Sequence, residues 1–79
     1  MKINQKFRSR KDLRCYMVYF EDEGPLEMSR VSASIVEQLR EDKTKDELIQ
    51  FVLEKYPRRN AKLEVENVIE TLQQLGLLS

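Results

Sequence analysis

Apolar residues follow two different spacings along the chain, and the spacing changes near residue 29. Before that point, aromatic and β-branched residues gather in RCYMVYF, residues 14–20, without a helical period. After it, apolar residues recur every three or four positions in three separate segments. The change predicts strands in the first part of the chain and helices in the second.

Three short strands are predicted at about residues 6–10, 14–20 and 25–28. The middle strand is apolar on both faces, which predicts that both are covered; one face holds Cys15, Met17 and Tyr19, and the other Tyr16, Val18 and Phe20. The following turn ends in Gly24, which can adopt a positive φ. Pro25 then opens the third strand, and its missing N–H is tolerated only at a strand's first position or at a sheet edge. The third strand is therefore an edge candidate.

Three helices are predicted at about residues 30–41, 45–56 and 63–75. Ser29 fits the N-cap of the first, and Thr44 with Glu47 fits a capping box that begins the second. The second helix ends before Pro57, and Gly76 fits the C′ position of the third. The buried stripes comprise Val31, Ile35, Val36 and Leu39; Leu48, Ile49, Val52, Leu53 and Tyr56; and Val65, Val68, Ile69, Leu72 and Leu75. Glu64 and Glu66 are placed in the first turn of the third helix, where the helix dipole favours acids.

Three short antiparallel strands followed by three helices predict an α+β fold of winged helix-turn-helix-like form. With 79 residues, the chain has room for a single domain, residues 1–79, with a small hydrophobic core.

Charge is balanced over the whole chain but not along it. Fourteen basic and fourteen acidic residues cancel, so the bulk charge gives no reason to expect an anionic membrane or nucleic acid as a partner. The first 14 residues nevertheless carry six basic groups and one acid. The candidates for electrostatic steering of an acidic peptide are Lys6, Arg8, Arg10, Lys11 and Arg14; a solvated surface strand explains them equally well.

The residue inventory offers little to a catalyst. Histidine is absent, which excludes sites that depend on imidazole, and one cysteine leaves no zinc site. Two glycines provide no phosphate-binding loop, and the acids of residues 21–23 lack calcium-loop spacing. Arg14 would favour a thiolate at Cys15, but an apolar strand suits a small hydrophobic side chain better. We expect no enzyme activity, no cofactor and no metal.

The single cysteine, the absence of a signal-peptide core and the absence of a long apolar run predict a cytoplasmic protein without membrane association. Nucleic-acid binding by a winged helix is the main alternative function. The third helix argues against it, because residues 63–75 contain three glutamates and no lysine or arginine. A structural module that dimerises through the open edge is a further alternative, and such an edge also invites weak or crystal-packing homodimers.

Four stretches carry a resemblance to a known family, and they occur in the family's order: LEMS (26–29), SASIVEQL (32–39), EDKTKDELI (41–49) and VIETLQQLGLL (68–78). The chain from about Phe7 to its end resembles the PqqD-like family, whose members are also called RiPP recognition elements. Met28-Ser29 stands where the family usually has Leu-Asn, and residues 40–43 lack its frequent glycine.

The resemblance implies a non-catalytic domain that binds the leader segment of a ribosomally synthesised precursor peptide. The leader would add as a strand to the third strand and be presented to a modifying enzyme, such as a radical SAM protein, a leader peptidase or a cyclase. The implied peptide-binding residues are Pro25, Leu26, Glu27 and Met28 on the strand and Val65, Val68, Ile69 and Leu72 on the third helix. The helix residues fit an ordinary core as well, and the sequence leaves open which helix face lines the groove.

Overall fold

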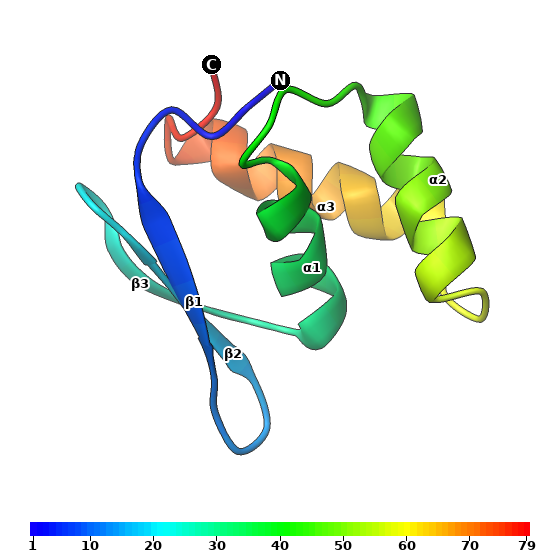
Figure 1. The fold of residues 1–79 in the computed structure, drawn as a ribbon, viewed down its shortest axis with the longest axis horizontal. Coiled ribbons are helices and arrows are strands. Elements are labelled where there is room, and N and C mark those ends of the chain that lie inside the picture. The colour runs from blue at the N-terminus through cyan, green and yellow to red at the C-terminus, as the bar shows by residue number, and fades with distance from the viewer.

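Three antiparallel strands come first along the chain and three helices follow them (Figure 1). The computed structural model describes all 79 residues. The strands are β1 (Phe7–Lys11), β2 (Tyr16–Phe20) and β3 (Gly24–Met28), and the sheet order is β1-β2-β3. The helices are α1 (Arg30–Gln38), α2 (Lys45–Lys55) and α3 (Ala61–Gln74). The predicted α+β class and order of elements are confirmed.

The sheet is covered by helices on one face only. All three helices lie to one side of it (Figure 1), and on that inner face Val18 and Phe20 of β2 are buried. On the outer face Tyr19 is half-buried, with the guanidinium groups of Arg8 and Arg10 at 5.9 and 5.8 Å from its ring centre. The sequence predicted that both faces of β2 would be covered. No helix covers the outer face, where arginine side chains from β1 lie over Tyr19 instead.

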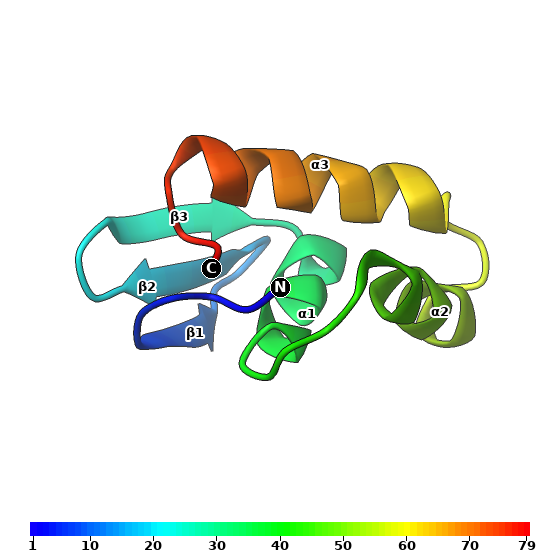
Figure 2. The ribbon, with the colours of Figure 1, turned by 90° about the horizontal axis from the view of Figure 1, so that it is seen from above.

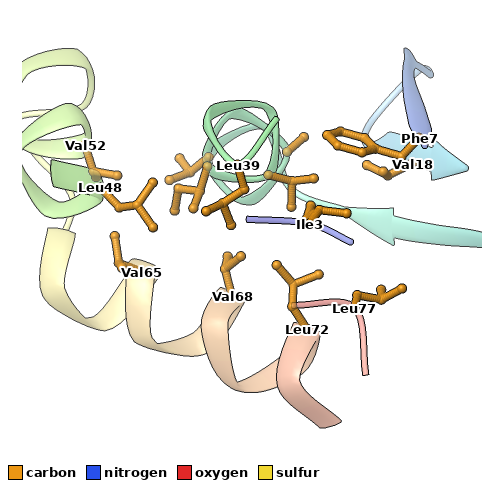
Figure 3. Close-up of a cluster of buried hydrophobic side chains, with 14 of the residues drawn as sticks. Ile3, Phe7, Val18, Leu39, Leu48, Val52, Val65, Val68, Leu72 and Leu77 are labelled. Atoms are coloured by element: carbon orange, nitrogen blue, oxygen red, sulfur yellow. The ribbon is translucent and has the colours of Figure 1, made fainter. Parts of the chain in front are cut away.

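The core joins all three helices to the sheet. Leu39, Leu48 and Val68 come from different parts of the chain and point into the same apolar space (Figure 3). One residue of the predicted stripes departs from this pattern: Leu53 is 45% exposed, because the buried line of α2 runs through Leu48 and Val52 and leaves Leu53 at its side.

The two ends of the chain are joined to each other and to the core. Ile3 is buried, lies opposite Leu78 in an isolated bridge, and donates its N–H to the Leu39 carbonyl at 3.0 Å. Gly76 has a φ of 71° and, as predicted, follows the end of α3; Leu77 donates to the Leu72 carbonyl at 2.9 Å in a Schellman arrangement. The sequence did not predict this pairing between the N-terminal and C-terminal segments.

Two helix limits differ from those predicted by more than one residue. Helix α1 ends at Gln38, three residues early, because Leu39 and Arg40 donate to carbonyls three residues back and tighten the last turn. Helix α3 begins at Ala61, two residues early, because the Asn60 side chain accepts from the Leu63 N–H at 3.2 Å.

The earlier start of α3 changes its charge pattern. Lys62 now belongs to the helix, and Glu66 lies beyond the first turn, where only Glu64 remains. Glu66 instead accepts a hydrogen bond from Lys45 of α2 at 2.7 Å, so it ties the two helices together.

The capping box at the start of α2 is confirmed in full. Glu47 donates its N–H to Thr44 Oγ1 at 3.1 Å, and Thr44 donates its N–H to Glu47 Oε1 at 2.9 Å. We expect Thr44→Ala to lower the unfolding free energy by about 1 kcal/mol and the melting temperature by roughly 4–8 °C. Thr44→Ser, which keeps the hydroxyl, should melt close to the parent in the same calorimetric scan. Equal melting of Thr44→Ala and the parent would contradict the contribution of the box.

Acid should destabilise the fold through two glutamates. The Thr44 N–H holds the pKa of Glu47 below its ordinary value, and the Lys45 ammonium does the same for the pKa of Glu66. A depressed carboxylate pKa contributes stability above the unfolded-state pKa, about 4.3 for Glu, and this is lost as the pH falls through the folded-state pKa. We expect the melting temperature to fall below about pH 4.3, and to fall less steeply for the double variant Glu47→Gln, Glu66→Gln. Parallel pH profiles for parent and variant would contradict this assignment.

Candidate functional site

The hydrogen-bonding pattern of the sheet decides which backbone groups are available at its edge. Along antiparallel strands, pairs that exchange backbone hydrogen bonds alternate with pairs that do not. The Glu21 N–H donates to the Lys6 carbonyl at 3.0 Å and the Asp12 N–H to the Cys15 carbonyl at 2.8 Å, at the two ends of the β1–β2 ladder. Odd-numbered residues of β2 therefore bond to β1, and even-numbered residues turn their backbone groups towards β3.

On β3, this alternation leaves one residue whose backbone N–H and C=O are both free of hydrogen bonds to the sheet. Leu26 lies opposite Val18 and Met28 opposite Tyr16, so both bond to β2. Glu27 directs its N–H and its C=O away from the sheet, and Pro25 directs only a C=O. The resemblance implied that Leu26, Glu27 and Met28 all bind peptide; among these three, the register leaves free backbone groups only on Glu27.

Ser29 extends the free edge by one donor. It remains in an extended conformation, with φ −68° and ψ 165°, and its N–H has no hydrogen-bond partner. Its C=O already accepts from the Ala33 N–H at 2.9 Å. The edge from Pro25 to Ser29 thus presents two donors and two acceptors.

A groove of about 340 Å³ lies beside this edge. Its lining comes from β3, the start of α1 and the middle of α3: Leu26, Glu27, Met28, Ser29, Ser32, Asn67, Val68 and Thr71. Figure 2 shows α3 running alongside β3, the strand that lies nearest to it. The volume falls at the lower end of the range for ligand-binding clefts, roughly 300–1,000 Å³.

The groove has an apolar floor and a polar rim. Leu26 and Met28 are half-buried against the core, and Val68 is buried beneath them. On the rim, Thr71 donates its hydroxyl to the Asn67 carbonyl at 3.0 Å, while the Asn67 side-chain amide is exposed and makes no hydrogen bond within the protein. The groove is therefore suited to apolar side chains that enter from an extended backbone.

Only some of the residues expected to bind peptide lie beside one another. Pro25, Leu26, Glu27 and Met28 lie along the edge or the groove, and Val68 joins them from α3. Val65 and Leu72 point into the core (Figure 3) and are fully buried, and Ile69 does not line the groove. The sequence-based hypothesis took the buried stripe of α3 as the groove wall, whereas a groove beside a core is lined by the residues that flank the stripe.

That flank supplies the residues that the sequence analysis missed. Asn67 and Thr71 each stand one position before a buried residue of α3, and Ser32 stands one position before buried Ala33 on α1 and is half-buried. Their signal in the sequence is a short polar side chain at helical spacing next to the apolar stripe.

The basic residues do not form one face beside the groove. Arg8 and Arg10 lie on the outer sheet face against Tyr19, and Arg10 is 3.9 Å from Asp12. Strand β1 forms the opposite edge of the sheet, about two strand spacings or roughly 10 Å from β3. Lys6 and Arg14 lie beyond the two ends of β1, and Lys11 lies on its opposite face from Arg10.

Cys15 has the environment of a thiol and not of a thiolate. Partial burial raises its pKa above the ordinary value, and the negative charge of Glu27 adds to the increase. No three histidine, cysteine, aspartate or glutamate side chains are grouped so that they would hold a metal ion. None of the three helices is both long and apolar enough to span a membrane.

No family model, curated protein or solved structure matches this chain. The assignment of a function therefore depends on the geometry of the β3 edge and its groove.

Proposed function

We propose that the protein is a non-catalytic domain that binds an extended peptide by antiparallel strand addition to β3. The observation that carries this proposal is the coincidence of two features: the free backbone groups of Glu27 and an apolar-floored groove between the same strand and α3. In strand addition, main-chain hydrogen bonds contribute affinity and side-chain pockets contribute specificity. Both requirements meet within residues 25–29 and 67–71.

The resemblance of the sequence to RiPP recognition elements suggests the ligand class. The peptide would be the leader segment of a ribosomally synthesised precursor, which the domain presents to a peptide-modifying enzyme. The domain itself carries out no chemistry in this proposal.

Energetics require the groove as well as the edge. Four backbone hydrogen bonds at about 1 kcal/mol each give roughly 4 kcal/mol, which is no more than the lowest estimates of the cost of association. A submillimolar complex needs more than about 4 kcal/mol of net binding free energy, so apolar side chains of the peptide must enter the groove. This favours a peptide whose apolar residues alternate along the strand.

The charge of the site supports a peptide over a nucleic acid. The only charged residue in the groove lining is Glu27, an acid, and nucleic-acid backbones are bound through lysine and arginine.

The proposal is tested by an NMR titration of ¹⁵N-labelled protein with the leader of any short precursor peptide encoded beside the gene. We expect saturable shifts at residues 25–29 and 67–71, with a submillimolar Kd, and the largest changes at the Glu27 and Ser29 amides, which gain acceptors. A scrambled leader of the same composition is the control. Shifts confined to residues 2–14, appearing with DNA or RNA and removed by salt, would contradict the proposal and favour nucleic-acid binding. Light scattering across a concentration series separates peptide binding from self-association.

A further inference from the structure

The free edge of β3 carries one charged side chain, and that charge forms no ion pair within the protein; the neutral thiol of Cys15 lies beside it. Glu27 is exposed on the outer sheet face, opposite Met17. The four ion pairs of the structure involve other residues. The outer-face arginines lie on the far side of β2, around Tyr19.

The sheet geometry fixes what would lie next to this carboxylate. In an added antiparallel strand, one residue exchanges both backbone hydrogen bonds with Glu27 and lies directly opposite, at about 5.5 Å between Cα atoms. Its side chain stands on the outer face beside the carboxylate, so opposite charges there attract and like charges repel. The residues before and after it turn to the inner face, towards Leu26, Met28 and Val68.

The same geometry disfavours a second copy of this chain as the occupant. Two β3 edges paired symmetrically at Glu27 would place two carboxylates opposite each other. A shift of two residues in one direction puts Pro25, which has no N–H, opposite Glu27. A shift in the other direction puts Ser29 there, and its C=O is already bonded to Ala33. Each register loses a hydrogen bond or gains a repulsion.

We propose that the natural occupant is a peptide strand with lysine or arginine opposite Glu27 and an apolar residue on each side of that basic residue. This inference rests on the proposed function of strand addition at β3, and it specifies the sequence class of the ligand. It replaces the acidic leader suggested by the basic N-terminal residues, because those residues lie along the opposite edge of the sheet.

The first test is selection from a display library of random peptides about 12 residues long. The targets are the parent protein, Glu27→Lys, and Glu54→Lys, which makes the same charge change at an exposed position on α2 outside the groove. The parent and Glu54→Lys should both enrich a basic residue between two apolar ones. Glu27→Lys should enrich aspartate or glutamate at that position.

The second test measures the coupling directly. One selected peptide is synthesised with lysine or with glutamate at the central position, and each form is titrated against the parent and Glu27→Lys. We expect the parent to bind the lysine form about two- to fivefold more tightly, and Glu27→Lys to invert the preference. Both preferences should weaken with added salt.

The outcomes separate this inference from the proposed function. Selected peptides that shift the Glu27 amide but show the same charge preference with all three proteins would overturn the inference and leave strand addition standing. Selected peptides that shift no residue of 25–29, or a failure to select any peptide, would overturn both.

Discussion

Replacing Glu27 with proline is expected to weaken peptide binding roughly tenfold or more while leaving the fold intact. The Glu27 N–H points away from the sheet, so its loss removes no hydrogen bond of the folded protein, and proline is tolerated at such an edge position. The added peptide loses a donor and leaves a carbonyl unsatisfied against the proline ring. An unpaired buried acceptor costs about 1–3 kcal/mol, so we expect the Kd to rise roughly tenfold or more.

Two matched variants separate the backbone effect from the others. Glu27→Ala removes the carboxylate and keeps the N–H, so it should retain strand addition. Leu26→Pro, one residue earlier, removes an N–H that bonds to Val18 and should lower the melting temperature markedly. If Glu27→Pro melts as low as Leu26→Pro, the alternation of free and bonded residues along β3 is wrong. If it folds normally and binds peptide as the parent does, the β3 edge is not the binding site.

The features that the sequence predicted well are those with a local physical cause. Pro25 indicated an edge strand because it lacks an N–H, and the edge position of β3 is confirmed. Thr44 and Gly76 marked helix ends through capping geometry that operates within five residues. Such signals depend on neighbouring residues alone, so they can be read before the fold is known.

The features that the sequence did not predict depend on residues far apart in the chain. The pairing of Ile3 with Leu78 leaves no periodic pattern, because each segment supplies only one or two residues. The availability of the Glu27 backbone depends on which residues of β1 bond to β2, and a one-residue change in register would reverse it. A strand's edge position can thus be read from sequence while its free hydrogen-bonding groups cannot.

The basic residues near the N-terminus illustrate the same limit for charge. Neighbours in sequence lie on opposite faces of a strand, so the cluster around β1 divides between two surfaces. The acid at Glu27 has no neighbouring charge of its own sign on β3, yet it is the only charged residue that lines the groove. Proximity in the sheet, and not local charge density along the chain, decides which charge a ligand meets.

Filling the groove is the second change with a large expected effect on binding. Thr71 is exposed on the groove rim, and its hydroxyl makes one hydrogen bond, to the Asn67 carbonyl. In Thr71→Trp, the indole would occupy much of the 340 Å³ groove and block the apolar side chains of the peptide. Since the backbone bonds alone do not support a submillimolar complex, we expect binding to weaken at least about tenfold.

The matched control is Gln73→Trp, which places the same side chain at an exposed position of α3 outside the groove lining. Both variants should melt near the parent, since exposed substitutions usually change stability by less than about 0.5 kcal/mol. Unchanged binding by Thr71→Trp together with lost binding by Glu27→Pro would mean that the strand adds to β3 without using the groove. Lost binding by Thr71→Trp with unchanged binding by Glu27→Pro would instead mean that the ligand occupies the groove without extending the sheet. Lost binding by both Glu27→Pro and Thr71→Trp, with unchanged binding by Gln73→Trp, requires a ligand that extends the sheet and occupies the groove at once.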